Sequence, residues 1–135
     1  MFCLFELRED VIEFQLDNMC VEYKKEVEGM SIEQSLYHHF EYVKRNKDYF
    51  IILYKNGFNM MVHEKFAAKI PGIMPIWTED SIEQEYRSEY IIAGIEAIQR
   101  VWITRGCIES IDKIVEFVRR AQDKQTPIRV GIVMV

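Results

Sequence analysis

The chain has 135 residues, of which 49% are hydrophobic and 29% charged, as is typical of one soluble globular domain with a real core. Its net charge of −5 is concentrated in residues 1–30, which hold three basic side chains and eight carboxylates (3 − 8 = −5). Because a nucleic-acid surface needs Lys and Arg to neutralise phosphates, this balance argues against DNA binding by the chain alone. No apolar run reaches the ~18 residues of a membrane span, and the N-terminus lacks a basic signal region. We therefore expect a cytoplasmic protein with no membrane contact.

Three helices are predicted in the first half of the chain. The first covers residues 8–28, where apolar side chains recur every three or four positions and Gly29 follows as a stop. The second opens at Ser31, and Gln34 three residues later completes a capping box. The third covers residues 46–56. Its β-branched and aromatic content would also allow a strand, but the caps and the helical neighbours favour a helix.

Three more helices are predicted in the second half, over residues 58–69, 78–105 and 110–123. Two prolines and a glycine within residues 71–75 enforce the break between the first two. The last two are joined by a tight turn at Gly106, and the final helix is amphipathic.

No Pro/Gly/Ser-rich linker divides the chain, so residues 1–124 are predicted to form one all-α domain, a bundle of about six helices. Residues 125–135, QTPIRVGIVMV, do not fit this pattern, since they contain a proline and are then apolar and β-branched. This irregular tail could be a short extended segment, a packed arm or an extension of no consequence.

The helix around residues 90–103 is apolar over much more than one face. Ile91, Ile95, Ile98 and Trp102 form one stripe at helical spacing, and several positions between them are also apolar. A surface helix needs an apolar arc of only about 100°. The wider arc predicts burial on two sides, either in a large core or against a second molecule.

Residues that could carry catalysis are scarce. The chain has no nucleophile elbow, no Walker A loop and no G-x-G-x-x-G motif. None of His38, His39 and His63 follows a Glu by three positions, as a di-iron bundle requires, and adjacent helical side chains point about 100° apart. We therefore predict no catalytic residue, no metal site and no cofactor, so the protein is not expected to be an enzyme. A helical metal-dependent enzyme is the weakest of the alternatives.

Aromatic and methionine side chains gather in the middle of the sequence. Such side chains can line a ligand cavity between helices, because Met adapts to irregular shapes and Tyr brings a polar tip to an apolar wall. The plain alternative is that they form the core. The candidate pocket residues are His39, Tyr42, Phe50, Tyr54, Met61, Phe66 and Trp77.

Three segments carry a resemblance to a known family. The first is the apolar helix with Gly94 and Arg100-Val101-Trp102, followed by the Gly106 turn and by Glu109-Ser110 at the start of the last helix. The second is NKDYFIILYKNGF at residues 46–58, and the third is FELREDVI at residues 5–12. Together they resemble the C-terminal regulatory domain of tetracycline-repressor-type (TetR family) transcriptional regulators, over roughly residues 5–121.

The resemblance implies that the last two long helices pair with their copies in a homodimer. The interface residues would be Ile91, Ile95, Ile98, Trp102, Ile114 and Phe117. It also implies a small hydrophobic effector in the helical cavity, which favours one arrangement of the helix over residues 8–28 and so moves the DNA-binding heads.

The family's helix-turn-helix precedes the region of likeness, so residues 1–8 are at most its remnant. DNA would be reached only through a helix-turn-helix that is not in this chain, and no DNA-contacting residue carries over. The sequence thus predicts a ligand-responsive, dimerising regulatory domain. The alternative is a helical protein–protein interaction module with a solid core and no small-molecule ligand.

Overall fold

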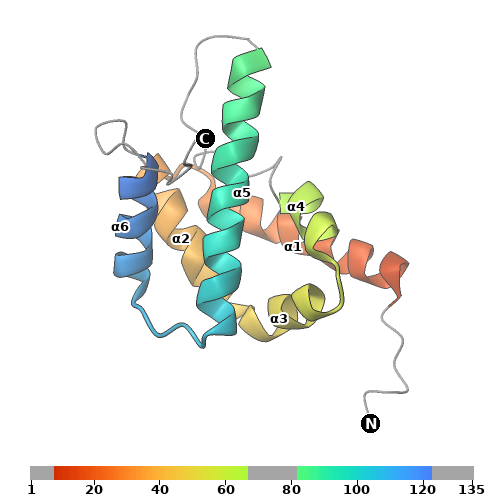
Figure 1. Cartoon of the computed structure of the whole chain (residues 1–135). Coiled ribbons are helices and arrows are strands. Elements are labelled where there is room, and N and C mark those ends of the chain that lie inside the picture. The colour runs from red at the N-terminus through yellow and green to blue at the C-terminus, as the bar shows by residue number, and fades with distance from the viewer. Residues whose placement is uncertain (1–7, 67–81, 123–135) are drawn as a thin grey trace, which may run out of the picture.

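The computed structural model describes residues 8–66 and 82–122, which form six helices and, within those ranges, no strand (Figure 1). They are α1 (Glu9–Val27), α2 (Ile32–Arg45), α3 (Lys47–Lys55), α4 (Asn59–Phe66), α5 (Ile82–Thr104) and α6 (Ile111–Gln122). The predicted all-α bundle of about six helices is confirmed. The predicted helix ends at residues 67–69 and 78–81, the irregular tail and the candidate pocket residue Trp77 lie outside the described residues.

The predicted helix ends follow from local hydrogen bonds. The Ser31 hydroxyl accepts from the Gln34 backbone N–H at 3.1 Å, and the Gln34 side chain accepts from the Ser31 N–H at 3.0 Å, which completes the capping box before α2. The turn after α5 places Gly106 (φ 90°) and Cys107 (φ 55°) in the left-handed region. Trp102 secures this turn, since its indole N–H donates to the Glu109 carbonyl at 2.9 Å.

Helix α2 is the centre of the bundle, because it packs against α1, α3, α5 and α6 (Figure 1). Phe40 of α2 and Trp102 of α5 meet edge to face, with ring centroids 5.8 Å apart, and both are almost fully buried. Helix α1 also packs against α4, and Leu16 and Tyr23 of α1 are buried. The core therefore draws on all six helices.

Helix α5 does not bury its apolar residues and expose its polar ones in the usual way. Gln99 is only 3% exposed and points into the bundle, alongside Ile95 and Trp102. On the outer side Tyr90 is 65% exposed and Val101 is 49% exposed. The wide apolar arc is therefore used in two ways: one part packs in the core, and the rest has no covering helix among the described residues.

Candidate functional site

A small internal cavity lies between α2, α3, α4 and α5. Its volume is about 20 Å³. Its walls are mostly apolar, with a few polar groups, and the lining residues are His39, Tyr42, Val43, Phe50, Val62, Phe66, Ile92, Ile95, Glu96 and Gln99. A cavity of this size holds about one water molecule. An effector of drug-like size would therefore have to push side chains aside in order to enter.

A chain of buried hydrogen bonds runs beside this cavity. His39 Nε2 lies 2.7 Å from Gln99 Oε1, and Gln99 Nε2 donates to the Tyr54 hydroxyl at 2.7 Å. Since Gln99 Oε1 can only accept, His39 must carry its proton on Nε2. Burial lowers the pKa of His39 to about 4, so the ring is neutral at pH 7. Its buried Nδ1 then keeps a lone pair with no hydrogen-bond partner among the described residues.

Four of the seven candidate pocket residues line this one cavity: His39, Tyr42, Phe50 and Phe66. Tyr54 does not line the cavity, but it bonds Gln99 and stacks on Phe50, which both line it. Met61 is partly buried and packs against the core. Trp77 lies outside the described residues.

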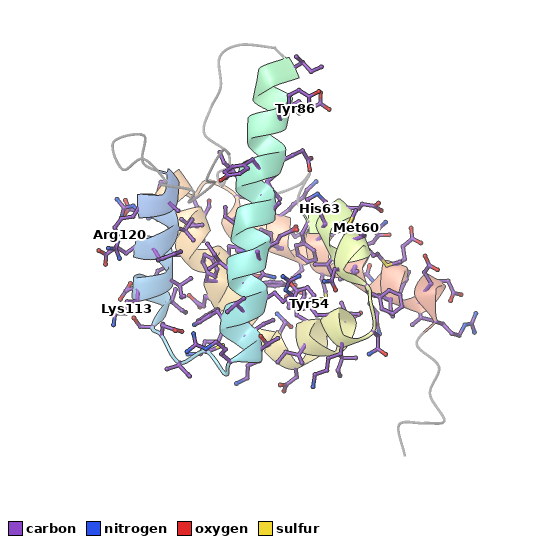
Figure 2. The ribbon with its side chains drawn as sticks, viewed as in Figure 1. Tyr54, Met60, His63, Tyr86, Lys113 and Arg120 are labelled. Atoms are coloured by element: carbon purple, nitrogen blue, oxygen red, sulfur yellow. The ribbon has the colours of Figure 1, made fainter. Side chains whose placement is uncertain are left out.

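A second hollow, on the surface between α3, α4 and α5, has a volume of about 340 Å³. Figure 2 labels Tyr54, Met60 and His63 from α3 and α4 on the side of α5 where this hollow opens. His63 Nδ1 lies 2.7 Å from Glu96 and its Nε2 lies 3.3 Å from Glu89, so both ring nitrogens face carboxylates. Burial lowers the pKa of His63, but the two carboxylates outweigh it and the pKa is raised.

Sequence reasoning missed Glu89, Glu96, Gln99 and Arg100 as site residues. In the sequence Glu96 and Gln99 stand out only as polar positions in an otherwise apolar helix. His63 and Glu96 are 33 residues apart, so no local spacing links them. The available signal was the position of Gln99 on the same helical face as Ile92 and Ile95, which implies a buried polar partner.

A third hollow is the groove between α5 and α6, with a volume of about 540 Å³. Apolar side chains form its floor and walls, and Arg105, Lys113 and Arg120 stand at its rim opposite a single carboxylate, Glu109. Figure 2 labels Lys113 and Arg120 on α6. The groove is thus an apolar trough with a mainly basic border.

Of the six candidate interface residues, Ile98, Trp102, Ile114 and Phe117 line this groove. Trp102 and Ile114 are buried in the chain's own core, whereas Phe117 is 53% exposed. Ile95 is buried and lines the internal cavity instead, and Ile91 packs, partly buried, against the core. Val101 also lines the groove with an exposed apolar side chain, and it is not among the six candidate interface residues.

Within residues 8–66 and 82–122, no three His, Cys, Asp or Glu side chains are grouped so as to hold a metal ion. No helix in that part of the chain is long and apolar enough to cross a bilayer. Comparisons with protein-family models, with curated proteins and with solved structures found no match to this chain.

Proposed function

We propose that this chain is a dimerising, ligand-responsive regulatory domain of a TetR-like transcriptional regulator in the cytoplasm. It would meet DNA through a helix-turn-helix, which in the TetR family precedes the region that this chain resembles. The observation that carries the proposal is the exposed apolar face along α5 and α6, where Val101 and Phe117 border a groove of about 540 Å³.

The exposed side of α5 suits close approach by a second helix. Tyr90, Gly94, Ala97 and Val101 recur at intervals of four, three and four residues, so they share one face. A Cβ built on Gly94 would meet nothing within 4 Å, so the interior of this chain does not require glycine there. Glycine in a helix costs about 1 kcal/mol relative to alanine. A close contact with another molecule would explain that cost.

The effector part of the proposal is supported by the composition of the internal cavity. Aromatic walls from Tyr42, Phe50 and Phe66 surround a chain of polar groups that ends at His39 Nδ1, which has no hydrogen-bond partner in residues 8–66 and 82–122. A small hydrophobic molecule with one hydrogen-bond donor would match these walls. Because the cavity holds only about one water, such a ligand would bind by moving Phe50 or Phe66, and so would favour a second arrangement of the bundle.

The proposed dimer can be tested by introducing one charged side chain into the exposed apolar face of α5. We expect Val101→Glu to weaken the homodimer roughly 100-fold or more in sedimentation-equilibrium measurements, because the interface would remove two added carboxylates from water. Val101 is 49% exposed in this chain, so the monomer should still fold with its helical circular-dichroism signal.

Val21→Glu is the matched control. Val21 is 55% exposed on α1, and it does not line the α5–α6 groove. This variant should dimerise as the wild type does. Dissociation by Val21→Glu with an unaffected Val101→Glu dimer would place the interface on α1 and contradict the proposal.

The alternative is a helical protein–protein interaction module with no small-molecule ligand, and the small size of the internal cavity favours it. A thermal-shift screen with hydrophobic small molecules separates the two functions. Concentration-dependent stabilisation supports the effector. A flat response across varied compounds supports the interaction module.

A further inference from the structure

The surface hollow between α3, α4 and α5 contains hydrogen-bonding groups that the fold leaves unused. Arg100 lines it and forms no ion pair with any described residue. The Tyr54 hydroxyl accepts from Gln99 and has no acceptor for its own proton among the described residues. Burial raises the pKa of Tyr54 to about 12, so this O–H remains protonated at neutral pH. One end of the hollow therefore offers a guanidinium and a phenol donor.

An acceptor lies one helical turn away. Glu96 Oε2 bonds His63 Nδ1 at 2.7 Å, whereas Glu96 Oε1 has no bond among the described residues and is not a buried unsatisfied atom. Glu96 and Arg100 are four residues apart on α5, so their Cβ atoms are about 6 Å apart. An acceptor and a group of donors therefore lie within the span of one small molecule.

The rest of the lining combines apolar side chains with the polar side chains of Asn59, His63 and Glu89. Ala93 and Ala97 form its floor on α5, and Met60 and Val62 of α4 form its wall. Alanine at both floor positions leaves space above α5 that a longer side chain would fill. The hollow of about 340 Å³ falls within the size range of small-molecule sites.

From this arrangement we infer that the hollow binds a free α-amino acid with an apolar side chain. The ligand carboxylate would lie between Arg100 and the Tyr54 O–H, where charge-assisted hydrogen bonds are strong. Its ammonium group would donate to Glu96 Oε1. Its side chain would cover Met60 and Ala93. A molecule with only one of the two charges leaves either Arg100 without an ion-pair partner or Glu96 Oε1 without a hydrogen bond.

This site goes beyond the proposed function, because Arg100 and Tyr54 line neither the α5–α6 groove nor the internal cavity, although Ala97 also borders the groove and Glu96 the cavity. Its link to the rest of the bundle is Tyr54, which is bonded to Gln99 and through it to His39 of α2. Binding at the hollow does not require that the chain dimerises, so the two proposals can fail separately.

The test is isothermal titration calorimetry at pH 7 on the full chain with L-leucine, L-leucinamide and N-acetyl-L-leucine. We expect saturable binding of L-leucine, and at least about tenfold weaker binding of the other two, since each lacks one charged group. Arg100→Gln should weaken L-leucine binding by at least about tenfold. Arg119→Gln, at an exposed position on α6 that lines none of the three hollows, should leave it unchanged.

Three results would overturn this inference. One is no saturable heat with L-leucine up to about 10 mM. Another is equal affinity for the free amino acid, the amide and the acetylated form. The third is an equal loss in Arg100→Gln and Arg119→Gln with both variants folded by circular dichroism.

Discussion

At the scale of single residues, the bundle is distinguished by polar side chains in its interior. Ser35, His39 and Gln99 are each less than 6% exposed. The pair of His39 and Gln99 joins α2 to α5 across 60 residues of sequence, and Tyr54 extends it to α3. A buried hydrogen bond adds modest net stability, but a buried group that loses its partner is costly. His39, Gln99 and Tyr54 therefore fix how α2, α3 and α5 are arranged.

The buried His39 predicts a loss of stability in acid. Its pKa is about 4 in the folded chain and about 6.5 when exposed, so the unfolded chain binds more protons between these values. The free energy of unfolding should therefore fall as the pH is lowered from about 6.5 to about 4, by up to about 3 kcal/mol from this residue. Urea unfolding at a series of pH values measures this slope.

His39→Gln is the comparison for that series, because Gln keeps a hydrogen-bonding side chain but does not titrate. His63 acts in the opposite direction, since its pKa is raised and its contribution is retained at low pH. It is present in both proteins and cancels in the comparison. Unfolding free energies that fall in parallel for wild type and variant would show that His39 is not the source of the acid sensitivity.

At the scale of helices, α5 shows what sequence reasoning could and could not predict. Local chemistry made the helix ends predictable, as with the Ser31–Gln34 capping box and the turn at Gly106. The apolar arc of α5 was also visible. Which part of that arc faces the core was not predictable, because it depends on His39, His63 and Tyr54, which come from three other helices and bond Gln99 and Glu96.

The same dependence on contacts between helices explains which candidate site residues the sequence could group together. His39, Tyr42, Phe50 and Phe66 could be grouped because aromatic residues of neighbouring short helices converge in a small bundle. Ile95 shares the predicted interface stripe with Ile98 because it is three residues away, yet side chains three residues apart still differ by about 60° around the helix axis. In the fold that difference separates the internal cavity from the α5–α6 groove.

Gly94→Ala tests whether the exposed side of α5 is covered in solution. In a chain held monomeric by Val101→Glu, the change should raise the free energy of unfolding by about 0.5–1 kcal/mol, because alanine favours the helix and the added Cβ meets nothing within 4 Å. In the otherwise wild-type chain it should weaken dimerisation, because the methyl group keeps the two α5 helices apart.

Both effects can be measured by urea unfolding and sedimentation equilibrium on the same preparations. A variant that is more stable as a monomer and dimerises as tightly as wild type would show that Gly94 lies away from the interface. Such a result would indicate that the dimer contact lies on the α6 side of the groove, around Phe117.

At the scale of the whole molecule, the three hollows lie in different parts of the described bundle. The internal cavity lies between α2, α3, α4 and α5. The surface hollow that Tyr54 and Arg100 line lies on the α4 side of α5, and the α5–α6 groove lies on its α6 side. Figure 1 shows α5 passing between α4 and α6, so a single helix borders all three. A ligand that shifts α5 would therefore alter the proposed dimer face directly, which is the coupling that a regulatory domain needs.

The most direct test of the dimer is native mass spectrometry on the purified protein at micromolar concentration. We predict a species of twice the chain mass of 16.2 kDa that Val101→Glu converts to monomer and Val21→Glu does not. An added small mass on that dimer would further support a bound effector. A monomer of bare mass at every concentration would contradict the α5–α6 interface and, with it, the proposed regulatory function.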